Sequence, residues 1–188
     1  LSTKISQMHR HLNSQRNMVD DIPVNNAANM LSKGLATAFE EYVKHNNGGK
    51  RGNCRVVMVV QPGETNTCDQ RDLEFLLGEK YGVPLVRKTL LELSRGSYGS
   101  NNDLLLKDED GDVITASVVY YRAGYTPENY PTEEEWKGRY MAEKSIAVKC
   151  PDVFYQLVGT KKIQQVLAEP GVLSRFTPHH ESLSATFT

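Results

Sequence analysis

Long apolar runs are absent from the 188 residues of this sequence, and the longest, such as Val56 to Val60, would fill only one strand. A helix that crosses a bilayer needs about 20 predominantly apolar residues, so we expect no membrane partner. The first residues are polar and lack the apolar core of a secretory signal peptide. Leu1 stands where an initiator methionine would be, which indicates a processed, truncated or renumbered polypeptide.

Cysteine is also scarce. The three cysteines, Cys54, Cys68 and Cys150, form no CxxC motif and no Cys/His cluster, and their number is odd. This pattern predicts neither a disulfide framework nor a zinc site, and it fits a reducing, cytoplasmic setting. The pair His179-His180 has no cysteine or carboxylate partner at a matching spacing, so we expect no metal site there.

The sequence also has no excess of either charge, because its 22 Lys and Arg residues nearly balance its 23 Asp and Glu residues. The basic residues are scattered along the chain. Nucleic acids and anionic membranes attract clustered positive charge, so this distribution argues against both as the main partner. A small molecule is the partner that we expect instead.

The first 50 residues predict a helical lead-in to a domain of ordinary size, which can bury about 70% of its unfolded surface. Residues 4–18 permit a weak, exposed helix. Asn25 and Asn26 are good N-cap residues for a second helix, and its apolar residues recur at helical spacing. The residues that would form its buried stripe are Met30, Leu31, Leu35, Ala38, Phe39, Tyr42 and Val43. A polar, glycine-rich connector over residues 46–52 then marks the clearest internal boundary.

Residues 51–158 predict an α/β domain, because strand-like and helix-like segments alternate there. Apolar runs predict strands at 54–60, 83–86 and 116–121, and two short strands at 104–106 and 113–114 flank a hairpin turn at Asp110-Gly111. We expect helices from Asp69 to about Tyr81, over 90–93, and from Thr132 to about Ala147. The predicted fold is a mostly parallel sheet with helices on both faces and an attached antiparallel hairpin. Residues 159–188 form a third segment, with a helix through Leu167.

The loop after the first strand is one candidate site, because ligands of open α/β sheets bind at the carboxyl ends of the strands. Glu64, Asn66 and Gln70 offer one carboxylate and two amides, a set suited to a ligand that carries both an ammonium group and a carboxylate. The alternative is structural: Asn66 and Asp69 would be turn and cap residues, and Glu64 would be solvated.

A second candidate is the end of the strand at 116–121, where an arginine follows the apolar run. Arg122 can hold a carboxylate with two parallel hydrogen bonds, and Gly124 lets the backbone turn so that Tyr125 returns towards the same ligand. A surface salt bridge and a packed tyrosine would explain the same residues.

A third candidate, Gly159-Thr160-Lys161-Lys162, stands at a helix start and could offer N–H groups and an ammonium group to a phosphate. It is not a P-loop, because the second glycine and the motif's spacing are missing. As a bare pattern it also describes an exposed basic cap.

Taken in order, these segments resemble the substrate-binding domain of eukaryotic glutathione synthetases over nearly the whole chain. The matching segments are Val56-Val57-Met58-Val59-Val60-Gln61, Glu64-x-Asn66-x-x-Asp69-Gln70-Arg71, Val86-Arg87-Lys88-Thr89, Val118-Val119-Tyr120-Tyr121-Arg122-Ala123-Gly124-Tyr125, Ala147-Val148-Lys149-Cys150-Pro151 and Gly159-Thr160-Lys161-Lys162-Ile163-Gln164-Gln165. Upstream, His9-Arg10-His11 and the segment from Asn25 to Ala36 look similar too. Several motifs in order are far more specific than any one of them.

The resemblance implies a three-layer, Rossmann-like (pre-ATP-grasp) fold and an ATP-dependent carbon–nitrogen ligase. In that family ATP phosphorylates the cysteinyl carboxylate of γ-glutamylcysteine, Mg²⁺ shields the phosphates, and the amine of glycine attacks the acyl phosphate. Carried over by position, the residues that would contact γ-glutamylcysteine are Glu64, Thr65, Asn66, Gln70, Arg122, Ala123, Gly124 and Tyr125. Lys161 would reach ATP. The resemblance also implies a homodimer, and it assigns no catalytic base here because such ligases act by positioning and charge stabilisation.

The resemblance covers only the middle of the family's chain. The magnesium ligands would precede Leu1 and the glycine-rich lid would follow Thr188. We therefore expect that this polypeptide alone does not catalyse the reaction. Thr65 stands where we expect arginine and Cys68 where we expect an aromatic residue, and the second amino acid remains open. The alternatives are a non-catalytic binding or effector module, a related ligase that uses another amino acid, and an unrelated nucleotide-binding domain.

Overall fold

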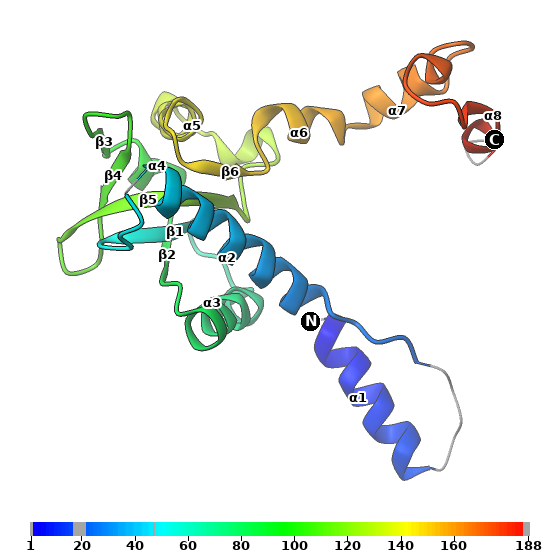
Figure 1. Ribbon diagram of the computed structural model, residues 1–188, viewed down its shortest axis with the longest axis horizontal. Coiled ribbons are helices and arrows are strands. Elements are labelled where there is room, and N and C mark those ends of the chain that lie inside the picture. The colour runs from blue at the N-terminus through cyan, green and yellow to red at the C-terminus, as the bar shows by residue number, and fades with distance from the viewer. Residues whose placement is uncertain (1, 17–21, 47, 186–188) are drawn as a thin grey trace. The chain divides into compact units, whose positions relative to one another are not determined.

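The structure is a computed structural model that describes residues 2–16, 22–46 and 48–185. The chain divides into two compact units, Leu1–Cys150 and Pro151–Thr188, which are treated separately below. The first unit holds the sheet and the helices that pack on it, labelled in Figure 1. No helix in the described part of the chain is long and apolar enough to cross a membrane.

The first unit is built on a six-stranded sheet in the order β2-β1-β5-β4-β3, with β6 paired to β5 beside β4. The parallel strands are β1 (Cys54–Val59), β2 (Leu85–Lys88), β5 (Val113–Tyr121) and β6 (Val148–Cys150). The strands β4 (Leu104–Lys107) and β3 (Ser97–Tyr98) are antiparallel to their neighbours. The predicted mostly parallel sheet with an attached hairpin is therefore confirmed.

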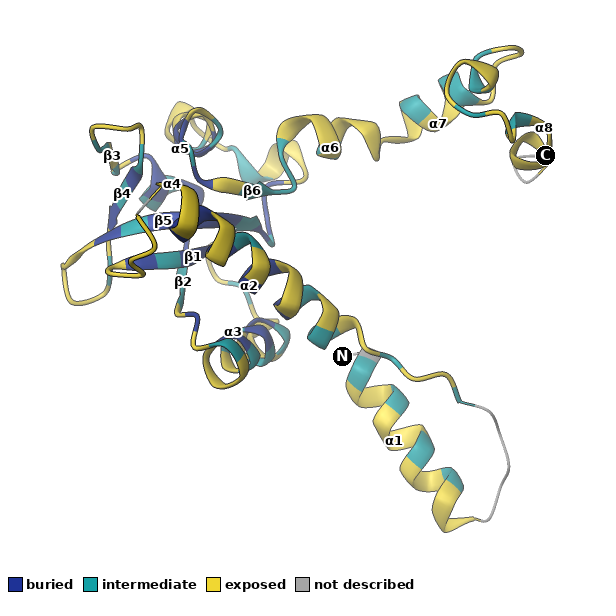
Figure 2. Ribbon diagram, in the orientation of Figure 1, coloured by how far each residue is buried: buried dark blue, intermediate teal, exposed yellow. Residues whose placement is uncertain are grey.

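Helices cover both faces of this sheet, which makes three layers. On one face α2 (Ala27–Asn46) and α3 (Thr67–Tyr81) enclose a core that includes Phe39, Leu77 and Val56. On the other face α4 (Leu90–Leu93) and α5 (Glu133–Lys144) enclose a core that includes Leu93 and Val57. Adjacent strand residues point to opposite faces, so the unbroken apolar run of β1 supplies both cores. Figure 2 shows β1 and β5 as the buried centre of this unit.

The helical lead-in forms as predicted, with one error in the buried stripe. Helix α1 spans Ser2–Gln15, and the last two positions of the prediction, 17 and 18, lie outside the described residues. The side-chain oxygen of Asn25 accepts the N–H of Ala27, the first residue of α2, at 3.1 Å and so stabilises the start of this helix. Met30, however, is 65% exposed. At about 100° per residue it lies across the helix from Phe39, near the centre of the buried face.

The predicted strands at 113–114 and 116–121 are in fact one strand, β5. Thr115 pairs with Cys54 of β1 and with Leu105 of β4, so the ladder continues through the position where we placed a break. Sequence patterning failed here because a bulge beside Ser117 shifts the register against β1 and reverses which residues face each core. Ser117 itself donates a hydrogen bond to the carbonyl of Arg55 at 2.8 Å.

Three predicted boundaries also move. Asn66, and not Asp69, is the N-cap residue of α3. Strand β2 starts at Leu85 instead of 83, because the N–H of Val83 bonds to Leu77 and completes the helix end at Gly82. Helix α5 begins with the predicted Thr132 cap but ends at Lys144. Its extension to Ala147 is wrong because the Ser145 hydroxyl donates to Ala142 and accepts the N–H of Ala147.

The second unit consists of short helices. They are α6 (Val153–Val158), α7 (Lys161–Leu167) and α8 (His180–Ser184), with a 3-10 turn, η2, at Leu173–Arg175. Asp152 starts α6, because its carboxylate accepts the N–H of Tyr155 at 2.8 Å. The predicted helix through Leu167 is confirmed as α7.

Candidate functional site

The carboxyl ends of β1 and β5 lie side by side, which brings the two sequence-predicted loops to one edge of the sheet. Val59 and Tyr121 are paired across the two parallel strands. One residue further on, the N–H of Arg122 donates to the carbonyl of Val59 at 3.0 Å. The loop after β1 and the loop after β5 therefore start from the same place, where ligands of open α/β sheets bind.

The loop after β1 is held by its own polar side chains. The Glu64 carboxylate accepts the N–H of Asn66 at 2.8 Å and the Gln61 amide at 3.3 Å. The Asn66 amide donates to the carboxylate of Asp69 at 3.2 Å. Thr65 is exposed between them. Glu64 and Asn66 thus shape the loop, as the structural alternative required. Glu64 is only partly buried and Asn66 is exposed, so the Glu64 oxygens can still accept a ligand ammonium group.

Arg122 and Asp69 line one pocket of about 200 Å³. The other residues that line this pocket are Thr3, Ala27, Ala28, Leu31, Asp72, Leu73 and Tyr120. The side chain of Arg122 is half-buried and forms no hydrogen bond or ion pair within 4 Å with another described residue. A guanidinium group held in a pocket without a bonded partner can take a carboxylate with two parallel hydrogen bonds. The surface salt bridge that we considered for Arg122 is therefore not formed with any residue that the structure describes.

Gln70 is the second group in this region with spare hydrogen-bonding capacity. It is only 2% exposed, and its amide nitrogen has no partner among the described residues. Leaving a buried donor unsatisfied costs about 1–3 kcal/mol. A ligand oxygen that accepted this N–H would remove that cost, although Gln70 is not among the residues that line the Arg122 pocket.

The loop after β5 is fixed by two residues that the sequence reasoning missed. The Asn129 side-chain oxygen accepts the N–H groups of Gly124 and Tyr125 at 2.9 and 3.1 Å, and the Tyr130 hydroxyl donates to the carbonyl of Gly124 at 3.0 Å. Gly124 has φ 95°, a conformation that favours glycine. The Tyr125 hydroxyl donates to the carbonyl of Tyr121. Asn129 ends the 3-10 turn η1 (Pro127–Asn129), and that Pro-x-Asn turn was the available signal.

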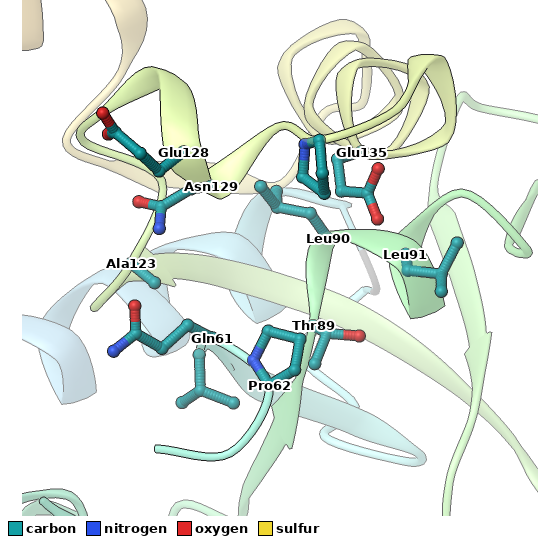
Figure 3. Close-up of a pocket in the computed structure, with 11 residues that line it drawn as sticks. Gln61, Pro62, Thr89, Leu90, Leu91, Ala123, Glu128, Asn129 and Glu135 are labelled. Atoms are coloured by element: carbon teal, nitrogen blue, oxygen red, sulfur yellow. The ribbon is translucent and has the colours of Figure 1, made fainter. Parts of the chain in front are cut away.

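Ala123, next to Arg122, lines a second pocket of about 290 Å³, which Figure 3 shows in close-up. Its apolar walls are Val60, Pro62, Leu90, Leu91 and Pro131, and its polar groups are Gln61, Thr89, Glu128, Asn129 and Glu135. Four separate chain segments meet here, so sequence spacing alone could not reveal the pocket. Its described lining residues include no Lys or Arg, in contrast to those of the Arg122 pocket.

The tyrosines at this edge act as neutral groups. Burial raises the pKa of Tyr120 and of Tyr125, although the nearby positive charge of Arg122 opposes the rise in both. Both phenols therefore keep their protons at neutral pH. Arg122 is the cationic group of the site, and no phenolate neutralises it.

Lys161 belongs to the second unit, where it is the first residue of α7. The N-cap residue of that helix, Thr160, makes no side-chain capping bond, because its hydroxyl donates to Leu157. Lys161 is exposed. Over the described ranges no group of three or more His, Cys, Asp or Glu side chains is arranged to hold a metal ion.

Comparison with known proteins identifies the family. The family model for eukaryotic glutathione synthase matches residues 54–158. The chloroplastic glutathione synthetase of Solanum lycopersicum is 40% identical over 98% of this chain, and that of Arabidopsis thaliana is 37% identical over 98%. The glutathione synthetase of Dictyostelium discoideum is 36% identical over 94% of this chain. The matches cover 33%, 33% and 37% of those proteins, so the chain spans about a third of their length.

A solved structure has the same fold. The apo form of a glutathione synthetase-like effector from Globodera pallida superposes with a TM-score of 0.74, covering 97% of this chain and 40% of that one at 20% sequence identity. The family model covers more than half of this chain, and its limits enclose the strands and loops that form the site. The chain therefore belongs to the eukaryotic glutathione synthase family.

Proposed function

We propose that this chain is the substrate-binding part of a glutathione synthetase that joins γ-glutamylcysteine to glycine at the expense of ATP. The observation that carries the proposal is the guanidinium of Arg122, which bonds to no other described side chain and lines a pocket at the carboxyl ends of β1 and β5. A dipeptide with two carboxylates and one ammonium group needs such a cation together with acceptors for its N–H groups.

Each of the proposed site residues contacts a different part of the dipeptide. Arg122 binds one of its carboxylates, and the buried amide of Gln70 donates to a second oxygen. Glu64, with Thr65 and Asn66 beside it, takes the α-ammonium group. Ala123, Gly124 and Tyr125 form the backbone wall that closes the site, fixed by Asn129. Holding the cysteinyl carboxylate still is the contribution of this chain to catalysis, because positioning provides much of the rate enhancement of such reactions.

ATP supplies the phosphoryl group that activates the cysteinyl carboxylate. Lys161, exposed at the start of α7, is suited to a phosphate oxygen of ATP. The Mg²⁺ ligands are proposed to lie outside this chain, which matches about a third of the length of its relatives. A cytoplasmic location and a homodimer belong to the same proposal.

Calorimetric titration of this chain with γ-glutamylcysteine tests the site directly. We expect saturable binding that Arg122→Ala weakens at least about tenfold, since the variant leaves a substrate carboxylate unpaired. Arg71→Ala is the matched control: Arg71 lies on α3 but already pairs with Glu74 at 2.7 Å. Equal affinities in both variants would remove Arg122 from the site.

An activity assay with the complete protein tests catalysis separately from binding. Incubated with ATP, Mg²⁺, γ-glutamylcysteine and either glycine or alanine, it is expected to form a tripeptide with glycine. A tripeptide formed only with alanine would identify the related ligase with another second substrate. Binding of γ-glutamylcysteine without any tripeptide would support the non-catalytic binding module instead.

A further inference from the structure

A third pocket, of about 240 Å³, shares no lining residue with the two at the candidate site. Its lining residues are Lys88, Glu92, Arg95, Gly96, Leu106, Lys107 and Asp108. They come from the end of β2, from α4 and the residues after it, and from the end of β4. Three of the seven are cationic, and they reach this pocket from three different places in the chain.

Lys88 is the buried cation of this pocket. The residue is 8% exposed, whereas the rest of β2 is only partly buried. Its ammonium group has three N–H donors. Among the described residues it has one hydrogen-bond partner, Glu92 Oε1, at the long distance of 3.3 Å. A buried ammonium group with unused donors is unfavourable unless another acceptor reaches it.

The two carboxylates of the pocket are already engaged by backbone and hydroxyl donors. Glu92 Oε2 accepts the N–H and the hydroxyl of Thr89, each at 2.8 Å, in the capping box of α4. Burial alone would raise the pKa of Glu92, but the hydrogen bonds from Thr89 and the charge of Lys88 outweigh it and lower that pKa. Asp108 Oδ1 accepts the N–H groups of residues 110 and 112 at 3.1 and 2.9 Å, which forms the hairpin turn.

The other two cations have no anionic partner. Neither Arg95 nor Lys107 forms an ion pair or a side-chain hydrogen bond with another described residue. Arg95 is held beside β4 by Gly96, where an added Cβ would meet Leu106 Cδ2 at 2.8 Å and the carbonyl of Leu105 at 2.9 Å. Because of this close approach, Arg95 and Lys107 line the same pocket as Lys88.

We propose that this pocket binds a small oxyanion, namely a phosphate group, either as inorganic phosphate or on a small phosphorylated molecule such as a nucleotide. The buried ammonium group of Lys88 supplies the fixed donor, and Arg95 and Lys107 close over the anion from the solvent side. A phosphate dianion fits this set because the three cations outnumber the two carboxylates, which already accept hydrogen bonds from Thr89, Lys88 and the backbone of the hairpin turn. The inference does not depend on the proposed ligase function.

Thermal unfolding of the whole chain in rising inorganic phosphate, with sodium chloride adjusted to constant ionic strength, tests the inference. A ligand that binds only the folded state raises the melting temperature in a saturable way. We expect such a rise for the unaltered chain and at least a tenfold loss of phosphate affinity in Arg95→Gln and in Lys88→Met. Arg95 is exposed, so Arg95→Gln decides the question even where Lys88→Met fails to fold.

Lys137→Met is the matched control. Lys137 also pairs with a glutamate at 3.3 Å, but its side chain is 54% exposed, against 10% for Lys88. Its phosphate response should equal that of the unaltered chain. The same titration with AMP identifies the source, because tighter binding of AMP than of phosphate indicates a nucleotide. A response no larger than that to chloride, or one that Arg95→Gln leaves unchanged, overturns the proposal.

Discussion

Asp69 and Arg122, 53 positions apart in the chain, line one pocket at the carboxyl edge of the sheet. Asp69 also accepts the amide of Asn66 at 3.2 Å, so its carboxylate belongs both to the loop after β1 and to the lining of the Arg122 pocket. Asp69 was expected to be a helix cap. From the first turn of α3 it instead orients Asn66, another proposed site residue.

Asp69→Ala should therefore weaken γ-glutamylcysteine binding by about three- to tenfold, the effect of one lost positioning hydrogen bond. Calorimetry measures the change. Asp72→Ala is the control, because Asp72 lines the same pocket without a hydrogen bond to the loop. If both variants lose affinity equally, the pocket's overall negative charge, and not the orientation of Asn66, is what matters.

Gly138→Ala tests the close packing of α4 against α5. An added Cβ at Gly138 would lie 2.0 Å from the carbonyl oxygen of Leu90, so one helix must move. We expect a loss of about 3 kcal/mol in the free energy of unfolding, measured by urea denaturation. Gly34 is at an exposed position of α2, and an added Cβ there would have no other atom within 4 Å. Gly34→Ala should instead raise the free energy of unfolding by about 0.5–1 kcal/mol. A neutral Gly138→Ala would contradict the packing described here.

The three thiols should react at different rates with a thiol reagent such as DTNB. Cys68 is exposed and should react first, Cys150 more slowly because burial raises the pKa of its thiol, and Cys54 only after unfolding because it is 1% exposed. Cys68→Ser should abolish the fast phase alone. Cys68 follows the loop that carries Asn66, so the thiol-free analogue γ-glutamyl-α-aminobutyrate should slow its reaction. A rate unaffected by saturating analogue would place the ligand away from this loop.

Glu92 should make the chain sensitive to acid. Its pKa is lower in the folded state than in the unfolded state, so the stabilisation is complete above the ordinary glutamate value of about 4.3 and is lost as the pH falls through the lowered folded value. We expect Glu92→Gln to cost about 1 kcal/mol at pH 7, a modest figure because the side chain is 41% exposed. Urea denaturation at pH 7 and pH 3.5 measures the gap between the two proteins. The gap should shrink in acid, and a gap of constant size would show that Glu92 acts through packing.

Local patterns in the sequence determined the elements whose signals lie within a few residues. The apolar run of β1 specified a strand buried on both faces, because each side chain of a strand alternates between the two cores. Thr132 and Glu135 specified the start of α5 through a capping box. The order of the motifs also specified the family, and the mostly parallel sheet followed from the alternation of strands and helices.

Contacts between distant segments were decided only by the tertiary structure. Ser117 lies in a bulge that depends on the register between two strands, so periodicity alone divided β5 in two. The role of Asn129 depends on how the chain turns after Gly124, and the grouping of Lys88, Arg95 and Lys107 depends on how closely Gly96 approaches β4. Spacing along the chain specifies hydrogen bonds within one element, whereas the meeting of charges from three elements depends on packing between them.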